Sequence, residues 1–210
     1  MKHIPIFVIF GIALSLCGLT SKLKKETSSN DSNKSAPTAS NNGASVERPV
    51  PTAAQIAAIS GGQTVSWDQQ GMSWTVPANW SKTTEESKEL VWRSPGSSDA
   101  ANLIVSISPM DESFPTDISI QAFYDGAKTR AKNGEVDELK WVEIDGLKGV
   151  QFRESNPEKP DGIRRLQWLA YRKFAGQVQM VNVMLASSGK GFPQHEDAMY
   201  GILYSTKITQ

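Results

Sequence analysis

Two long apolar runs joined by a short turn constrain the fold of this chain more than any other feature. Residues 163–188 read IRRLQWLAYRKFAGQVQMVNVMLASS. In each run the side chains alternate with a period of two, and β-branched and aromatic residues are common, which predicts two strands rather than a helix. Bulky apolar groups fall on both faces, so we expect this hairpin, with Trp168 buried mid-strand, at the centre of a sheet covered on both sides. Gly176 favours a short hairpin loop with a bulge.

Length and composition predict one ordinary domain with extensions. The chain has 210 residues, and Lys plus Arg and Asp plus Glu both number 22, so the net charge at pH 7 is zero. This balance does not indicate a nucleic-acid-binding surface, and we expect no nucleic acid among the partners. Six tryptophans predict a substantial core, which a domain of about 150 residues can form without disulfides. Cys17 is the single cysteine, so no disulfide can form within the chain.

The first 16 residues have the composition of a signal peptide. Lys2 and His3 precede an apolar run, Ile4–Leu16, that is short for a membrane-spanning helix. The segment LSLC that ends at Cys17 resembles a bacterial lipobox, although a small residue is usual at the position of Leu16. We therefore expect Cys17 to be acylated, with chains such as palmitate, and to anchor the protein to a membrane.

This anchor predicts a location in the bacterial cell envelope, facing the periplasm or the exterior. The alternative is a secreted soluble protein, because Ala13-Leu14-Ser15 also satisfies the rule for ordinary signal cleavage. Residues 18–51 are rich in Ser, Asn, Thr, Ala and Lys, a composition that cannot repay the entropy of folding. We expect residues 17–60 to comprise the lipidated cysteine and a disordered tether, in which Ala53–Ile59 permits one turn of helix.

The folded domain is expected to span residues 61–210. It begins with a hairpin of two alternating segments, Gln63–Trp67 and Met72–Val76, around the turn Asp68-Gln69-Gln70-Gly71. Trp67 and Trp80 are expected to pack in the core. Further strands are expected at residues 89–93, 102–108, 135–144, 147–154 and 206–209.

Two helices interrupt the strands. Residues 118–133 place apolar side chains at helical spacing, and Asp117 or Ser119 could cap this helix while Gly134 ends it. The second helix begins at Pro193. The apolar face of the first helix comprises Ile120, Phe123, Tyr124, Ala127 and Ala131, and that of the second Met199, Ile202 and Leu203.

This order of elements resembles the PsbP/Mog1-like family, including its bacterial secreted members. The resemblance covers about residues 61–210 and rests on pattern rather than on a catalytic signature. It implies an α+β fold in which helices flank a central antiparallel sheet, an α/β/α sandwich. Characterised members bind other proteins, as photosystem II subunits or partners of the Ran GTPase, and no contact residue can be transferred. The segments that carry the resemblance are residues 74–80 (WTVPANW), 101–105 (ANLIV), 144–149 (IDGLKG), 186–188 (ASS) before Phe192, and 204–208 (YSTKI).

Candidate catalytic residues are few. His195 is the one histidine expected after signal removal, and with no cysteine beside it we expect neither a metal site nor a cofactor. We expect His195 to be a solvated residue in the first turn of its helix. The sequence has no G-x-S-x-G nucleophile elbow, and residues 187–191 (SSGKG) lack the spacing of a phosphate-binding loop. Paired carboxylates at residues 111–112 and 135–138 are interpreted as solvated surface charges.

A polar patch at one end of the central hairpin is the candidate binding site. Arg164 and Arg165 follow a charged loop that contains Glu158 and Asp161, and arginine is favoured in protein interfaces. We therefore predict a membrane-tethered binding or accessory module, not an enzyme, with an envelope protein as its partner. Two alternatives remain open: an envelope hydrolase with a concealed site of converging Ser, Asp and His195, and a small-ligand or lipid carrier with an enclosed apolar cavity.

Overall fold

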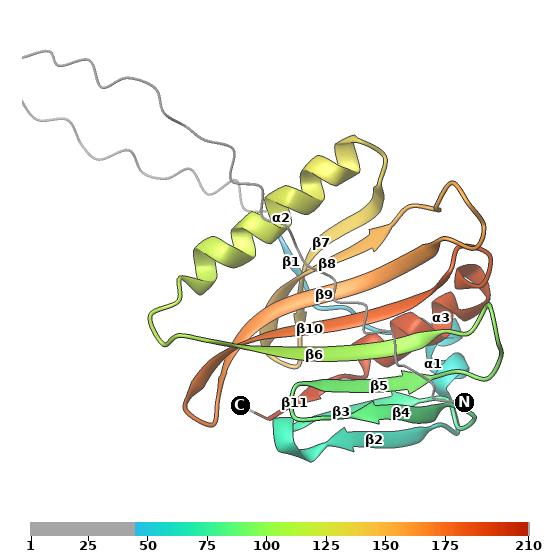
Figure 1. Cartoon of the computed structure of the whole chain (residues 1–210), viewed down its shortest axis with the longest axis horizontal. Helices are drawn as coiled ribbons and strands as arrows, with labels where there is room; N and C mark the ends of the chain where they lie inside the picture. Colours follow the sequence, from blue (N-terminus) through green and yellow to red (C-terminus); the bar gives the residue numbers. More distant parts are fainter. Residues whose placement is uncertain (1–44, 210) are drawn as a thin grey trace, which may run out of the picture. The chain divides into compact units, whose positions relative to one another are not determined.

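An eight-stranded sheet forms the middle of the structure, a computed structural model that describes residues 45–209 (Figure 1). Its strands lie in the order β1-β7-β8-β9-β10-β6-β5-β4. Neighbouring strands are antiparallel except β1 and β7, which run parallel. The strands are β1 (Val46–Glu47), β4 (Ser81–Glu85), β5 (Glu89–Arg93), β6 (Asn102–Met110), β7 (Val136–Ile144), β8 (Leu147–Glu154), β9 (Ile163–Phe174) and β10 (Gln177–Ser188).

The predicted central hairpin is confirmed. β9 and β10 occupy the middle of the sheet, with Trp168 opposite Val183, and the side chain of Trp168 is fully buried. The expected bulge in the loop is wrong. Phe174 pairs directly with Gln177, so the loop contains only Ala175 and Gly176, at φ 50° and 78°. Two consecutive left-handed residues are the geometry of a type I′ turn, whose twist matches that of the flanking strands.

One face of the large sheet packs against α3 (Phe192–Tyr204) and a second, smaller sheet. The smaller sheet has the order β11-β3-β2, and a short 3-10 turn, Asp68–Gln70, joins β2 to β3. Alternation directs Trp67 and Trp74 inward, and both are buried in the core between the sheets, as is Trp80. This core burial confirms the two alternating segments and the final helix predicted from the sequence. The strands of the smaller sheet are β2 (Gln63–Trp67), β3 (Met72–Val76) and β11 (Lys207–Ile208).

The opposite face of the large sheet is only partly covered, although cover on both sides was expected from the sequence. α2 (Thr116–Lys132) lies across β7, β8 and β9 and leaves β10, β6 and β5 uncovered on the face seen in Figure 1. Its Ala127 is buried in a second, smaller apolar cluster with Val150 and Leu169. The helix is not capped by Asp117 or Ser119 as expected, because it begins directly after Pro115 without a side-chain hydrogen bond. Gly134, at φ 79°, follows the last turn as predicted.

The described structure includes residues before Gly61, at which the domain is expected to begin. Residues 46–60, here called the strap, contain β1 and α1 (Ala53–Ile59). A reciprocal pair of hydrogen bonds between Thr52 and Gln55 starts α1, which then packs against α3 at Gly201. A Cβ atom at Gly201 would lie 2.7 Å from the Gln55 carbonyl, so glycine permits this close helix contact.

The packing of the strap could not be predicted from its composition. α1 has no buried residue and attaches through backbone approach and the half-buried Ile59, so it lacks the apolar periodicity that marks a domain helix. The predicted signal peptide, Cys17 and the predicted tether up to residue 44 lie outside the described residues. Within residues 45–209, no helix is both long and apolar enough to cross a membrane.

Candidate functional site

The structure does not bring the predicted binding residues together as one patch. Arg164 and Arg165 are neighbours on a strand, so their side chains point to opposite faces of the sheet. Arg164 is buried; its Nη2 lies 2.6 Å from Asp137 Oδ2, and its guanidinium stacks 4.5 Å from the ring centroid of Phe192. Arg165 is half-buried on the side of α2, where its Nη1 lies 3.0 Å from Glu154 Oε2. Arg164 is therefore a structural residue.

Glu158 and Asp161, the acidic members of the predicted patch, are exposed on the loop between β8 and β9. Within residues 45–209, no ion pair joins either of them to Arg164 or Arg165. The four residues are close in sequence but do not form a common surface, because strand alternation places the two arginines on opposite faces of the sheet.

His195 is half-buried rather than solvated, and it meets two serines at Asp99. Its Nε2 lies 3.1 Å from the backbone oxygen of Asp99. Ser187 Oγ donates to the same oxygen at 3.0 Å, and Ser188 Oγ donates to the Asp99 carboxylate at 2.9 Å. The Ser, His and Asp that a hydrolase would need thus converge, at the junction of β10 and α3.

The geometry at Asp99 is not that of a catalytic triad. A nucleophilic serine needs a ring nitrogen that accepts its proton. Nε2 of His195 instead faces a carbonyl oxygen, toward which it must donate, and the described contacts include no hydrogen bond from the ring to either serine. Both serines are buried, and Ser188 Oγ also accepts from the Gly191 backbone N–H. The cluster fastens the loop at residue 99 to the start of α3.

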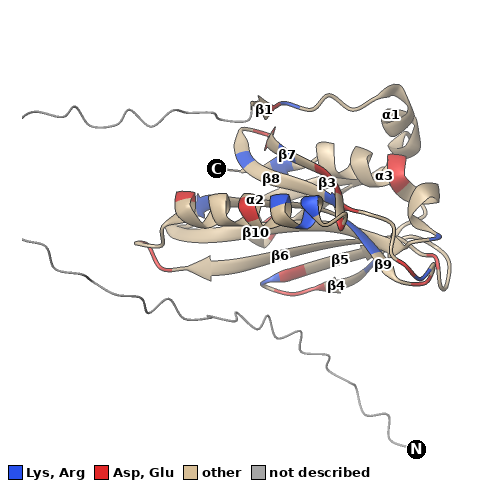
Figure 2. Cartoon of the chain, turned by 90° about the horizontal axis from the view of Figure 1, so that it is seen from above, with Lys and Arg blue, Asp and Glu red and all other residues tan. Residues whose placement is uncertain are grey.

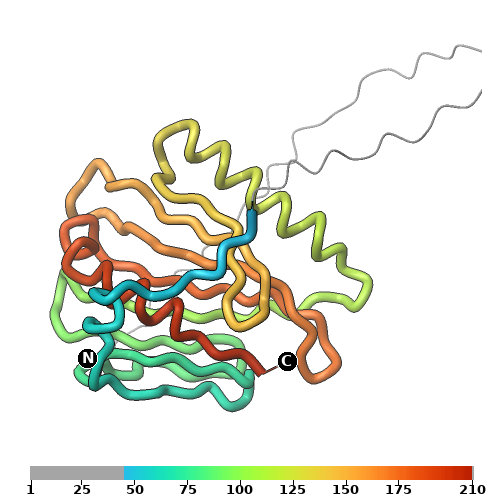
Figure 3. Tube along the Cα trace, turned by 180° about the vertical axis from the view of Figure 1, so that it is seen from behind, coloured from blue at the N-terminus to red at the C-terminus, as the bar shows by residue number. Residues whose placement is uncertain are grey.

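A cleft beside the strap gathers many ionisable side chains. The strap forms one wall, and β7, β8 and α3 form the other, enclosing about 480 Å³. Figure 3 shows the blue-to-cyan strap running alongside the red α3. In Figure 2 the acidic residues at the start of α3 lie beside α1. The ionisable residues of the wall opposite the strap are Glu138, Lys140, Arg153, Glu196, Asp197, Tyr200 and Tyr204.

Arg153 organises the centre of this cleft. Its Nε lies 2.7 Å from Asp137 Oδ1, and its Nη1 pairs with the carboxylate of Glu196 on α3. Burial alone would lower the pKa of Arg153, but these carboxylates outweigh burial and raise it, so the side chain stays charged. The arginine therefore ties α3 to the edge of the large sheet and is held in place by two acids.

Two tyrosines from α3 complete the wall. The ring centroids of Tyr200 and Tyr204 lie 5.7 Å apart. Burial raises the pKa of Tyr204 to about 12, and burial together with the nearby Glu138 also raises the pKa of Tyr200. The hydroxyl of Tyr200 accepts a 3.5 Å hydrogen bond from Arg153 Nη1. Behind them, the fully buried Gln151 donates from Nε2 to Glu138 Oε1 at 2.6 Å.

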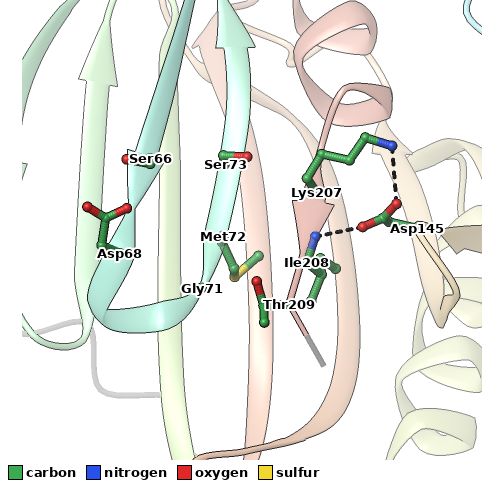
Figure 4. Close-up of a pocket in the computed structure, with 9 residues that line it drawn as sticks. All are labelled: Ser66, Asp68, Gly71, Met72, Ser73, Asp145, Lys207, Ile208 and Thr209. Carbon is green, nitrogen blue, oxygen red and sulfur yellow. Dashed lines mark hydrogen bonds and ion pairs between the residues drawn. The ribbon is translucent and has the colours of Figure 1, made fainter.

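A second, shallower pocket of about 400 Å³ lies at the edge of the smaller sheet (Figure 4). Ser66, Ser73 and Lys207 lie in one row on its floor, by the pairing of the three strands. Its one acidic wall residue beside Lys207, Asp145, is already engaged, because it accepts from Lys207 Nζ at 3.1 Å and from the Ile208 backbone N–H at 2.8 Å. This pocket is therefore primarily the attachment point of the last strand.

Sequence reasoning missed the cleft because its walls are distant in the chain. Glu47 on the strap, Glu138 on β7 and Tyr200 on α3 meet only once β1 pairs with β7 and α1 packs on α3. One signal was available: Glu196 and Asp197 lie near the start of a helix that also carries Tyr200 and Tyr204 one turn apart.

No family model and no curated protein sequence matches the chain. Solved structures do resemble it. LpqN of Mycobacterium tuberculosis, described as involved in cell envelope biogenesis, has a TM-score of 0.51 at 15% identity, over 71% of this chain and 86% of LpqN. CyanoP, the PsbP of Synechocystis, has a TM-score of 0.46 at 14% identity, over 70% of this chain and 92% of CyanoP. The Ran-binding protein Mog1p of Saccharomyces cerevisiae has a TM-score of 0.41 at 8% identity, over 70% and 95%.

The chain shares its overall fold with LpqN. Its α+β architecture, a large and almost wholly antiparallel sheet flanked by helices, confirms the class that the sequence resemblance predicted. At 15% identity the similarity to LpqN describes the fold and assigns no activity.

Proposed function

We propose that this chain is a binding or accessory protein of the bacterial cell envelope, held at a membrane through Cys17 and without catalysis of its own. The observation that carries the proposal is the cleft beside the strap. Its charged groups are fixed by one another, as Arg153 is by Asp137 and Glu196, while its outer rim carries the exposed Val50. Charged groups held in place by one another favour specific recognition of another molecule, and the exposed Val50 adds apolar contact area.

The solved structures support this proposal at the level of the fold. LpqN, the protein with the higher TM-score, is described as involved in cell envelope biogenesis. Residues 1–17, with their apolar run and lone cysteine, are the sequence basis for export and lipid attachment. An acylated Cys17 would place the cleft near the membrane, because Glu47 follows it by only 30 positions.

A hydrolase is the second candidate. The observation that favours it is that Ser187, Ser188 and His195 all contact Asp99. We rank it lower because the geometry there leaves no base for a serine nucleophile, as His195 Nε2 faces a carbonyl. A lipid carrier is ranked lower still. The space between the two sheets, where an apolar cavity would have to lie, is filled by the buried side chains of Trp67, Trp74 and Trp168.

Site-specific photo-cross-linking tests the binding proposal. A photoreactive amino acid is placed at Val50, which is 84% exposed on the rim of the cleft, and in a separate variant at Ile118, which is 72% exposed on α2. We expect an envelope protein to be captured at Val50 but not at Ile118. Capture should fall when Asp197→Asn and Tyr204→Ala are combined with the Val50 probe. Equal capture at both positions would contradict the assignment of the cleft.

The absence of catalysis is tested separately on the full-length chain. Esterase, phosphatase and glycosidase reporters are each assayed with the wild type and with His195→Ala. If the wild type turns over a reporter and His195→Ala does not, the protein is a hydrolase and the proposal that it lacks catalysis is wrong.

A further inference from the structure

The cleft beside the strap carries more acid than base. Four carboxylates line it against two cations, Lys140 and Arg153, and each of these cations is paired with one of the carboxylates. The other two carboxylates, on Glu138 and Asp197, have no ion pair among the described residues. An occupant with positive charge would offset both of them.

A buried amide lies under the floor of the cleft. Gln151 is two positions from Arg153 on β8, so the two side chains point to the same face of the sheet. Lys140, which lies opposite Gln151 on β7, and Glu138, which accepts from Gln151 Nε2 at 2.6 Å, both line the cleft. The Gln151 side chain is therefore directed at the cleft.

This amide is only half satisfied. Gln151 is fully buried, and its Oε1 has no hydrogen-bond partner among the described residues. A buried acceptor without a donor is costly. Together with the unpaired carboxylates of Glu138 and Asp197, it gives this part of the cleft more acceptors than donors. An occupant should therefore bring N–H groups, of which lysine carries three and arginine five.

Two aromatic rings favour a cation for a separate reason. Tyr200 and Tyr204 lie one turn apart on α3, line the cleft and have ring centroids 5.7 Å from each other. The faces of tyrosine rings attract ammonium and guanidinium groups. Carboxylates, an unpaired amide oxygen and tyrosine rings together match the side chain of a lysine or an arginine.

The cleft is also longer than one side chain. A second hollow, of about 310 Å³, adjoins it, because Pro49 and Tyr204 line both. The two cations of this hollow, Arg48 and Lys207, are each paired with an acid that also lines it. The unpaired acid therefore lies in the first cleft only, while the space continues past Pro49. A stretch of polypeptide would occupy both hollows, whereas a small free amine would occupy one.

From this excess of acceptors and this length, we infer that the occupant of the cleft is a segment of a partner protein that places a lysine or arginine side chain against Glu138 and Asp197. The inference rests on the proposed function and deepens it, because it names the chemistry that the envelope partner presents. The charge of the side chain offsets the two carboxylates, and the residues beside it in the segment lie along the hollow beyond Pro49.

Isothermal titration calorimetry of the purified full-length chain tests the inference. The probe is a hexapeptide of alternating lysine and serine, blocked at both ends. The control peptide has acetylated lysine side chains, which removes the charge and keeps the sequence length. We expect the lysine peptide to bind about tenfold more tightly than the control. Salt at about 0.5 M should weaken its binding, because the screening length falls below about 5 Å. Equal binding of the two peptides, or no binding of either, would overturn the inference.

Matched variants separate the cleft from general surface charge. Glu138→Gln/Asp197→Asn should weaken binding of the lysine peptide about tenfold, because two charge-assisted contacts are lost. Glu86→Gln/Glu89→Gln changes two exposed acids at the far edge of the sheet and should leave the affinity unchanged. Asp197→Asn alone, at an exposed position, should weaken binding about threefold and replaces the double variant if that variant does not fold. Equal losses in the cleft variants and the edge variant would contradict the assignment of the cleft.

The side-chain amide of Gln151 reports whether the peptide reaches the floor. Its NH₂ resonances, assigned from triple-resonance spectra, should shift as the lysine peptide is added and stay in place with the acetylated peptide. Bound peptide with an unmoved Gln151 signal would place the binding site elsewhere and refute the inference.

The photoreactive probe at Val50 keeps this inference separate from the proposed function. Excess lysine peptide should lower the capture of envelope protein at Val50 several-fold, and the acetylated peptide should not. Capture that neither peptide lowers would refute the basic segment and leave the binding function intact. If no protein is captured and the free polyamine spermidine binds the same carboxylates more tightly than the peptide, the occupant is a small amine. Both the inference and the protein-binding function would then be wrong.

Discussion

The carboxylate of Asp145 accepts a 2.8 Å hydrogen bond from the backbone N–H of Ile208, on the last strand of the smaller sheet. Asp145 belongs to the turn between β7 and β8, so this single side chain ties the edge of the large sheet to the C-terminal strand. Lys207 Nζ adds a second contact at 3.1 Å. Asp145 thus serves both a type I′ turn, at φ 48°, and the attachment of β11.

This contact predicts an acid dependence of stability. The backbone hydrogen bond from Ile208, assisted by Lys207, lowers the pKa of Asp145 below its usual value. The carboxylate therefore stabilises the fold fully above its unfolded pKa of about 3.9, and this contribution is lost as the pH falls through the lower folded value. Asp145→Asn should cost about 1.5–3 kcal/mol at pH 7, the usual worth of a hydrogen bond to a charged group.

Urea unfolding at pH 7 and at pH 3 measures this dependence. The gap between wild type and Asp145→Asn should narrow at the lower pH, because the wild-type carboxylate is then partly protonated. Asp197→Asn is the control, since Asp197 is exposed. A gap that is equal at the two pH values would contradict the role of the charge.

The turn between β9 and β10 predicts a stabilising substitution. Ala175 occupies a left-handed conformation at φ 50°, which costs a non-glycine residue about 1–2 kcal/mol. Asparagine tolerates this conformation better and is favoured in type I′ turns, so Ala175→Asn should stabilise the protein by about 0.5–1 kcal/mol. The midpoint temperature of thermal unfolding should rise by about 2–3 °C. Gly176→Ala, at φ 78° in open space, should shift the midpoint in the opposite direction.

Trp168 is predicted to be among the costliest residues to truncate. It is fully buried at the centre of the core, so Trp168→Ala should cost about 3–5 kcal/mol. Gly149 on the neighbouring strand should be nearly as sensitive, because a Cβ atom there would lie 2.8 Å from the Trp168 ring carbon Cε2. Denaturant midpoints of both variants test this, and a midpoint near that of the wild type would place Trp168 outside the core.

The strap predicts where a minimal folded fragment begins. A fragment that starts at Ser45 keeps the contact of α1 with α3 and the half-buried Ile59, whereas one that starts at Gly61 loses both. The shorter fragment should be less stable by about 1 kcal/mol, below the value for fully burying an isoleucine, because Ile59 is only half-buried. Indistinguishable thermal midpoints would show that the strap contributes nothing to stability.

Lipid attachment is a prediction about Cys17. Wild type and Cys17→Ser are expressed in a bacterium and partitioned between detergent and aqueous phases. We expect the wild type in the detergent phase, because the acyl chains on Cys17 would enter the detergent. We expect the variant in the aqueous phase, because it cannot carry these chains. If the wild type also partitions into the aqueous phase, the lipoprotein interpretation is wrong.

Much of the fold could be predicted because its signals are local. Local sequence patterns determine the backbone conformation in three places. They are the alternation along residues 163–188, the turn pair Asp145-Gly146 and the helix that ends before Gly134. The exceptions are contacts made at a distance. The strap carries no apolar face of its own, so only its packing on Gly201 reveals that it belongs to the fold.

The site was harder to predict for the same reason. Arg164 and Arg165 are adjacent in sequence and suggested one patch, but the strand sends them to opposite faces and buries Arg164. The side chains that do meet, such as Glu47, Glu138 and Tyr200, are separated by about 60 to 90 positions, and no spacing rule links them.

The pairing of β11 with β3 has a consequence for biosynthesis. Lys207 pairs with Ser73, and Ser205 Oγ accepts from the Thr75 backbone N–H, so the first hairpin of the smaller sheet is completed by residues made 130 positions later. Such pairing over long sequence separation forms slowly and late. On a ribosome, the inner faces of β2 and β3, with Trp67 and Trp74, would remain without their final neighbours until the segment that forms β11 had also emerged.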